Sequence, residues 1–211
     1  MKPQPPSNQT LFTVGHSSLE MTDFLKQLSI YKVKLVCDVR SRPASFRFPQ
    51  FNREPLEACL AAEGIKYEFV GESLGGRPSD PRAYHADGLV NYEERRKAAD
   101  FLAGIGQALK LARSSNVALM CAEEDPLQCH RFLMICPALL ERGVTPSHIR
   151  RGGVLESQRE AEDRLLKLND LAAFDSSSLF VFERDAAIKD ALRRQAKEFA
   201  FRASADAMEY F

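Results

Sequence analysis

Residues 11–40 read LFTVGHSSLEMTDFLKQLSIYKVKLVCDVR, and the fold class follows from this stretch. A short apolar run at 11–14 precedes a segment at 20–28 whose apolar residues recur at helical spacing, and a second apolar run follows at 34–39. The pattern predicts a strand, a helix and a second strand. Strands that alternate with helices over short linkers form a mostly parallel sheet with helices on both faces.

The same alternation continues to about residue 150. Further strands are expected at 67–70, 117–120 and 146–149, and further helices at 52–63, 92–112 and 127–142. The connection at 71–91 exceeds ~15 residues, a length typical of a functional or disordered segment. We therefore expect a three-layer α/β domain over residues 11–150.

The two ends of the chain differ from this domain. Residues 1–10 are polar and rich in proline, which predicts a disordered tail. Residues 151–211 predict a helical C-terminal extension with charged amphipathic helices at 155–171 and 186–201 and a stray strand at 180–182. The exposed faces of these helices offer a contact through which the protein can form an oligomer.

Composition narrows the class of protein. The 211 residues are 45% hydrophobic and 27% charged, as in an ordinary globular protein. Basic and acidic residues number 29 each, so a net charge of zero exerts no global attraction for nucleic acid or an anionic membrane. No apolar run is long enough for a membrane helix. Five scattered cysteines favour a reducing cytoplasm over a secreted disulfide scaffold.

The polar clusters follow the predicted strands. His16 follows the first strand, Arg40 and Arg42 the second, Arg77 the third and Cys121 the fourth. Ligands of parallel α/β sheets bind beyond the carboxyl ends of the strands. We therefore expect these five side chains to meet in one hollow at the same edge of the sheet.

The stretch VALMCAEEDPLQCHR at 117–131 holds the candidate reacting groups. A helix that begins after Asp125 would place a positive helix end near Cys121, with His130 and Arg131 close by. Such surroundings lower the pKa of a thiol and make it a nucleophile. On this hypothesis Cys121 attacks the substrate, His130 carries protons and Arg131 stabilises developing charge, while Glu123 serves as a second acid or base.

Two other interpretations of Cys121 stay open. A cysteine at the end of a core strand often does no more than pack. Alternatively, Cys121, Cys129 and His130, with His16, ligate zinc or iron. The separation of Cys121 from Cys129 differs from the two to four residues typical of paired zinc ligands, so the spacing favours this interpretation least.

The stretch DVRSRPASFRFPQFNR at 38–53 is a candidate anion site. Arg40, Arg42 and Arg47 occur with no acid after Asp38, and arginine binds phosphate or carboxylate through two parallel hydrogen bonds. We expect Arg40 to be exposed and to serve binding rather than stability. The alternative is a solvated loop whose arginines pair with surface acids. Its phenylalanines either stack on a base or anchor the loop.

Two short glycine-containing segments complete the candidate site. Gly75 and Gly76 permit close approach of the backbone to a ligand, and Arg77 follows them. Neither segment matches a nucleotide-binding glycine fingerprint. After Gly15, His16 is either a proton carrier or a hydrogen-bonded structural residue, and Ser17 is a candidate substrate contact.

Seven motifs in this order resemble one family. They are VGHS at 14–17, DVRSRP at 38–43, FN at 51–52, GIKY at 64–67, LGGR at 74–77, LMCAE at 119–123 and CHR at 129–131. The chain resembles the bacterial and archaeal family catalogued as domain of unknown function 488, over about residues 11–149. The resemblance implies a compact Rossmann-like α/β domain and brings no established reaction.

The leading hypothesis is a cytoplasmic, cysteine-dependent hydrolase or transferase. It acts on a phosphate-bearing or other anionic substrate, such as a nucleotide or a nucleic-acid component. One alternative is a non-catalytic module in which the same arginines and phenylalanines bind a nucleotide or single-stranded nucleic acid. Another is a metal-binding protein with a cysteine and histidine site. The sequence requires no cofactor.

Overall fold

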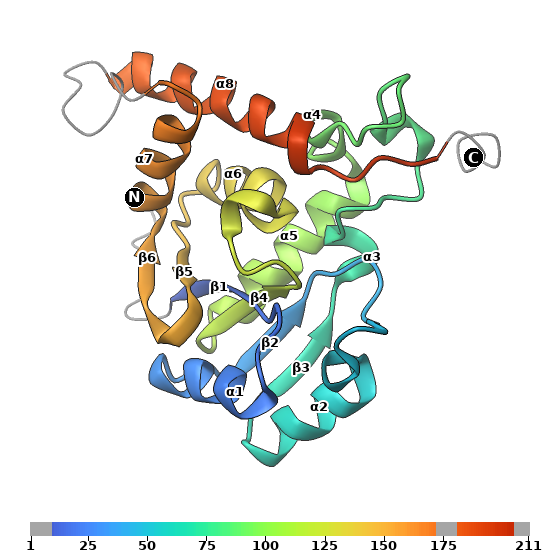
Figure 1. Cartoon of the computed structure of the whole chain (residues 1–211), viewed down its shortest axis with the longest axis vertical. Coiled ribbons are helices and arrows are strands. Elements are labelled where there is room, and N and C mark those ends of the chain that lie inside the picture. The colour runs from blue at the N-terminus through green and yellow to red at the C-terminus, as the bar shows by residue number, and fades with distance from the viewer. Residues whose placement is uncertain (1–9, 172–180, 205–211) are drawn as a thin grey trace.

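A computed structural model describes residues 10–171 and 181–204. Within these residues, six strands form one central sheet in the order β3-β2-β4-β1-β5-β6 (Figure 1). The strands are β1 (Leu11–Gly15), β2 (Leu35–Asp38), β3 (Lys66–Phe69), β4 (Val117–Cys121), β5 (Ser147–Ile149) and β6 (Leu155–Ser157). Strands β1 to β5 pair in parallel, and β6 runs antiparallel to β5. The prediction of a mostly parallel sheet is confirmed.

Helices cover both faces of this sheet (Figure 1). They are α1 (Met21–Ile30), α2 (Arg53–Ala62), α3 (Gly71–Leu74), α4 (Tyr92–Arg95), α5 (Ala99–Ala112), α6 (Cys136–Leu140), α7 (Gln158–Leu168) and α8 (Val181–Phe199). Side chains of α1 and α2 pack on one face, and those of α5, α6 and α7 pack on the other. The three-layer α/β architecture is therefore confirmed.

The strands supply both halves of the core. Because side chains alternate along a strand, Val36 faces α1 and α2 while Leu35 and Cys37 face α5. Strand β4 does the same, with Met120 on the first side and Leu119 on the second. Strands buried on both faces read as continuous apolar runs, which explains the short apolar stretches in the sequence.

Two predicted helices are interrupted. The segment expected at 92–112 divides into α4 and α5 because the backbone is extended at Ala98; across this break the Arg95 guanidinium bonds the carboxylate of Asp100. The segment expected at 127–142 consists of a 3₁₀ turn (Pro126–Gln128), a π-helical turn (Arg131–Ile135) and α6. Pro137 lacks the N–H that would continue an α-helical ladder through this region.

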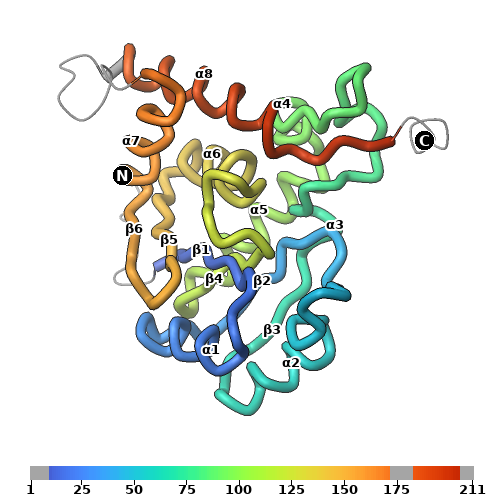
Figure 2. The backbone as a smooth tube through the Cα atoms, in the orientation of Figure 1, coloured from blue at the N-terminus to red at the C-terminus, as the bar shows by residue number. Residues whose placement is uncertain are grey.

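The beginning of the C-terminal part also differs from the prediction. The sequence predicts a helix from residue 155, but residues 155–157 form β6, because their backbone pairs with β5. Helix α7 begins only after Ser157, which shares a reciprocal cap with Glu160. Helix α8 then crosses the molecule toward α4 (Figure 2), and it contacts α7 and the π-helical turn at Arg131–Ile135. Its buried Ala191 belongs to the same hydrophobic core as Leu165 of α7.

Some predictions fall at the limits of the described residues. Residues 1–9 of the expected tail and Phe180 of the expected stray strand lie outside them, while Val181 and Phe182 begin α8 rather than a strand. Over residues 10–171 and 181–204, none of the helices combines the length and apolar character needed to cross a membrane.

A buried histidine joins β5 to β1 and α7. His148 is fully buried; its Nδ1 lies 2.8 Å from the Thr13 hydroxyl and its Nε2 lies 3.1 Å from Gln158 Oε1. The amide oxygen accepts only, so Nε2 carries the hydrogen and Nδ1 accepts from Thr13. Burial, with the nearby charge of Arg131, lowers the pKa of His148 from 6.5 to about 4.

Because the pKa of His148 is low in the folded protein, we expect the protein to lose stability in mild acid. Between its folded and unfolded pKa values, the unfolded chain binds a proton that the folded chain does not, so stability falls as the pH falls. We expect His148→Gln to reduce the pH slope of the unfolding free energy by about 1.4 kcal/mol per pH unit between about pH 6 and 4.5. Urea unfolding at several pH values measures it, with exposed His85→Gln as the matched control. An unchanged slope in His148→Gln would contradict the assignment.

Candidate functional site

A cavity of about 720 Å³ opens at the carboxyl edge of the sheet. All the candidate site residues line it except Arg131 and Gly75. His16 arrives from β1, Arg40 and Arg42 from β2, Arg77 from the segment after β3, and Cys121 from β4. The expected convergence of these segments at one edge is confirmed.

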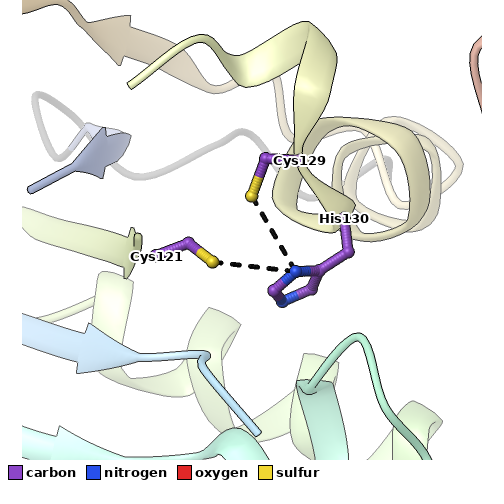
Figure 3. Close-up of side chains that lie close together, drawn as sticks. All are labelled: Cys121, Cys129 and His130. Carbon is purple, nitrogen blue, oxygen red and sulfur yellow. Dashed lines mark hydrogen bonds between the residues drawn. The ribbon is translucent and has the colours of Figure 1, made fainter. Parts of the chain in front are cut away.

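Two cysteines and one histidine of the cavity lining form a buried cluster (Figure 3). The sulfur atoms of Cys121 and Cys129 lie 3.7 and 3.8 Å from His130 Nδ1. His130 Nε2 lies 2.9 Å from the carbonyl oxygen of Val39. A carbonyl only accepts, so Nε2 carries a hydrogen, and Nδ1 faces both sulfurs.

Of the three acids after β4, one faces this cluster. The Cys121 thiol donates to Glu123 Oε2 at 3.0 Å. The Glu123 side chain keeps an exposed surface, but partial desolvation of its carboxyl and the nearby charge of Cys129 raise its pKa. Glu124 instead pairs with Arg150, and Asp125 pairs with Arg164. Of these three acids, it is therefore Glu123 that lies beside the Cys121 thiol.

The two thiols differ electrostatically. Burial raises the pKa of Cys121, and the negative groups of Cys129 and Glu123 raise it further. Burial acts in the same direction on Cys129, but its contact with Cys121 and the charges of Arg131 and His130 outweigh it and hold that pKa below its ordinary value. The thiolate of the cluster is thus favoured on Cys129, whereas the sequence predicts a thiolate at Cys121.

Arg131 lies behind the cavity rather than in it. Its guanidinium is buried and donates to the carbonyl oxygens of Glu123 and Glu124, which holds the loop after β4 in place. The positive helix end expected near Cys121 is absent from this described segment, because a 3₁₀ turn and a π-helical turn replace the first turns of an α-helix. The positive charge near the thiols comes from Arg131 and His130 instead.

Arg40 is buried, which corrects the expectation of an exposed side chain. It is only 6% exposed, and its Nε and Nη2 bond the two carboxylate oxygens of Asp38 at 2.9 and 2.6 Å. The hydroxyl of Tyr67 donates to the same carboxylate. Because Asp38 neutralises Arg40, removal of Arg40 would leave a buried carboxylate without its partner, at a large cost in stability.

His16 is held as a neutral ring. Arg40 Nη1 donates to its Nε2 at 3.2 Å, and its Nδ1 lies 3.0 Å from the Ser17 carbonyl oxygen. Burial, with the charge of Arg40, lowers its pKa to about 4. The ring stacks on Phe51, with centroids 4.3 Å apart. With both nitrogens occupied, the geometry favours the structural interpretation of His16 over proton transfer.

Three arginines at the mouth of the cavity differ from Arg40. Arg42, Arg47 and Arg77 are exposed, and among the described residues none of them forms an ion pair with a carboxylate. The guanidinium of Arg47 lies 5.5 Å from the ring centre of Phe48, and that of Arg77 lies 4.6 Å from that of Phe201. These aromatic contacts orient the two side chains and leave their hydrogen-bond donors available.

The phenylalanines of residues 38–53 show both expected roles, anchoring the loop and offering a ring for stacking. Phe51 is fully buried and anchors the loop, and Phe48 is half-buried and lines the cavity. Phe46 is fully exposed beside Arg47. An exposed aromatic ring next to unpaired arginines is available for stacking.

Two glycines make room for the cluster. A Cβ atom on Gly76 would lie 2.9 to 3.1 Å from three atoms of the His130 side chain. A Cβ on Gly15 would lie 1.7 Å from the Glu123 carbonyl oxygen. Gly75 is packed in the same way against Ser41. The close approach that these glycines permit is therefore to the protein itself.

Several residues that line the cavity are not predicted from the sequence. Tyr92, Gln128, Phe199 and Phe201 line the cavity beside the predicted residues. The two phenylalanines reach it because the backbone after α8 pairs with residue 90, through the bond from Val90 N to the Phe201 carbonyl. No local pattern signals such a return.

Comparison with known proteins gives one match. The family model for "Domain of unknown function DUF488" matches residues 20–135. No curated protein and no solved structure matches the chain. The matched segment includes Arg40, Cys121 and His130, but it excludes His16 and the two C-terminal phenylalanines of the cavity.

Because Gly76 packs on His130, we expect a larger side chain at position 76 to destabilise the fold. Gly76→Ala should destabilise the fold by about 1–3 kcal/mol, because the added methyl group meets the imidazole ring. Gly106→Ala is the matched control: its Cβ enters open space within α5, so it should stabilise by about 0.5–1 kcal/mol. Urea unfolding of both variants measures the difference, and equal effects would refute the proposed contact.

Proposed function

The chain belongs to the family catalogued as domain of unknown function DUF488, which brings no reaction, and we propose from the site that it is an enzyme acting on a phosphate-bearing anion. The arginines at the mouth of the cavity bind the anion. The cluster of Cys121, Cys129, His130 and Glu123 in the same cavity carries out a hydrolysis or group transfer.

The observation that carries this proposal is the unpaired charge of Arg42, Arg47 and Arg77. In a chain with no net charge, three guanidinium groups without carboxylate partners among the described residues line one cavity. Arginine binds phosphate through two parallel hydrogen bonds, and a concave site strengthens the attraction. A phosphate group is the ligand that this arrangement suits best.

The aromatic residues support a nucleotide or nucleic-acid component as the substrate. Phe46 is exposed beside Arg47, and Phe48 lines the cavity. A base can stack on either ring while its phosphate reaches the arginines. The same features would serve a module that binds a nucleotide or single-stranded nucleic acid without transforming it, which is the second candidate function.

The groups beside Cys121 favour an enzyme over that module. Glu123 and His130 both contact Cys121 inside the same cavity, so two groups that can transfer a proton lie beside a thiol. We assign Arg40 and His16 to positioning, because Asp38 neutralises the first and the second has both nitrogens bonded. The five unpaired thiols suit the reducing cytoplasm, where we place the protein.

Anion binding is tested on the cavity arginines. Arg42→Ala and Arg77→Ala should each weaken the binding of a nucleoside monophosphate about tenfold, which is about 1.4 kcal/mol, with little change in melting temperature. Arg82→Ala is the control, because Arg82 is exposed and pairs with Asp80 outside the cavity. Calorimetric titration measures the affinities. The absence of binding to the wild type, or an equal loss in Arg82→Ala, would exclude the proposed anion site.

Turnover distinguishes the enzyme from the binding module. We expect the wild type to convert at least one member of a panel of nucleoside mono-, di- and triphosphates and short oligonucleotides. Glu123→Gln should bind that compound with similar affinity but convert it at least about 100-fold more slowly, as expected for a group that transfers protons. Phosphorus NMR follows the products. Binding without conversion across the whole panel would favour the module.

A further inference from the structure

The cysteine and histidine cluster has the dimensions of a metal site. Cys121 Sγ, Cys129 Sγ and His130 Nδ1 all lie within 4.8 Å of one another, and the two sulfur-to-nitrogen distances are 3.7 and 3.8 Å (Figure 3). Zinc–sulfur and zinc–nitrogen bonds of about 2.3 and 2.0 Å place tetrahedral ligand atoms about 3.5–3.8 Å apart. The two sulfur-to-nitrogen distances are therefore already close to the spacing that a zinc ion requires, and the two sulfurs lie within 4.8 Å of each other.

The histidine is oriented as a metal ligand. Its Nε2–H donates to the Val39 carbonyl oxygen, which leaves Nδ1 facing the two sulfurs as the nitrogen that can bind a metal. Metal-binding histidines usually donate their second ring N–H to such a carbonyl or carboxylate, which fixes both the tautomer and the ring orientation. Gly76 packs against the ring and restricts it further. The orientation of His130 is thus independent support for a ligand at Nδ1.

The site offers three protein ligands and an open side. His16 is excluded as a fourth ligand, because Arg40 occupies its Nε2 and the Ser17 carbonyl faces its Nδ1. Cys121, Cys129 and His130 all line the cavity. Three ligands with a fourth position open to a cavity characterise catalytic rather than structural zinc sites.

We propose that Cys121, Cys129 and His130 bind one Zn²⁺ ion whose fourth coordination position faces the cavity. Two thiolates and an imidazole are ligands that select zinc over magnesium or calcium. This site deepens the proposed function. It rests on that function in one respect, because the substrate anion would approach the open coordination position of the zinc ion. It also makes Cys121 a ligand rather than a nucleophile.

The separation of Cys121 from Cys129 in the sequence disfavours a zinc site, but the fold brings the two cysteines together. Rules on paired ligands describe two residues of one tight turn. Here Cys121 ends β4, and Cys129 and His130 follow the 3₁₀ turn at Pro126–Gln128. Arg131 holds this connection closed through the carbonyls of Glu123 and Glu124, so the two cysteines meet at the same imidazole.

The test uses the full chain without a polyhistidine tag, purified under reducing conditions without chelator. Elemental analysis should give about one zinc per chain. After zinc is removed with a chelator, added Co²⁺ should produce a near-ultraviolet thiolate-to-cobalt charge-transfer band and the intense visible bands of a tetrahedral site. Added Zn²⁺ should abolish both.

Variants assign the ligands. Cys121→Ser, Cys129→Ser and His130→Ala should each lose the cobalt bands or shift the midpoint of the cobalt titration at least about tenfold. Cys59→Ser is the matched control, since Cys59 lies half-buried on α2 and should retain the bands unchanged. Circular dichroism reports the folding of each variant, and the wild-type cobalt spectrum tests the metal site even if a variant fails to fold.

The outcomes separate this proposal from the proposed function. A folded wild type that retains no zinc and gives no thiolate-to-cobalt band overturns the metal site, as does loss of the band in Cys59→Ser. Calorimetric titration of the same metal-free protein with a nucleoside monophosphate measures the anion site independently. Cobalt bands without anion binding would support the metal site and refute the anion site, and the reverse result would do the opposite.

Discussion

The parallel pairing of β4 with both β1 and β2 holds the candidate site together. It sets Gly15 opposite Cys121 and Asp38 opposite Met120, so three strands end at nearly the same level. The ladder continues past the strands, through the bonds from His16 N to the Cys121 carbonyl and from Val39 N to the Met120 carbonyl. Loops that share backbone hydrogen bonds in this way have little freedom to separate, and the side chains that they carry converge as a consequence.

The charges of the site are arranged by depth. The buried guanidinium groups bind within the protein: that of Arg40 pairs with Asp38, and that of Arg131 donates from Nη1 and Nη2 to two carbonyl oxygens while its Nε has no hydrogen-bond partner among the described residues. Burial makes an unsatisfied charge costly, so these two arginines shape the site. At the mouth, exposed arginines such as Arg42 keep their donors free at little cost because water solvates them. A net charge of zero conceals this division between structural and available charges.

The cavity extends beyond the segment that the family model matches. Phe199 and Phe201 form part of its wall, and Arg77 lies over the ring of Phe201. The match ends at residue 135, well before α8. The C-terminal part of this chain therefore shapes a cavity whose cysteine, histidine and arginine residues lie largely within the matched segment.

The amino-acid sequence alone determined the alternation of strands and helices, because apolar periodicity is a local property. It also determined the edge of the sheet at which the polar clusters gather, because parallel strands share one carboxyl edge. Folding in three dimensions settled which partner each side chain takes. Arg40 turned inward to Asp38, and Cys129 joined Cys121 at His130, whose ring is held by a carbonyl some ninety residues earlier in the chain. Such contacts depend on side-chain rotamers and on distances between strands, and no local pattern encodes either.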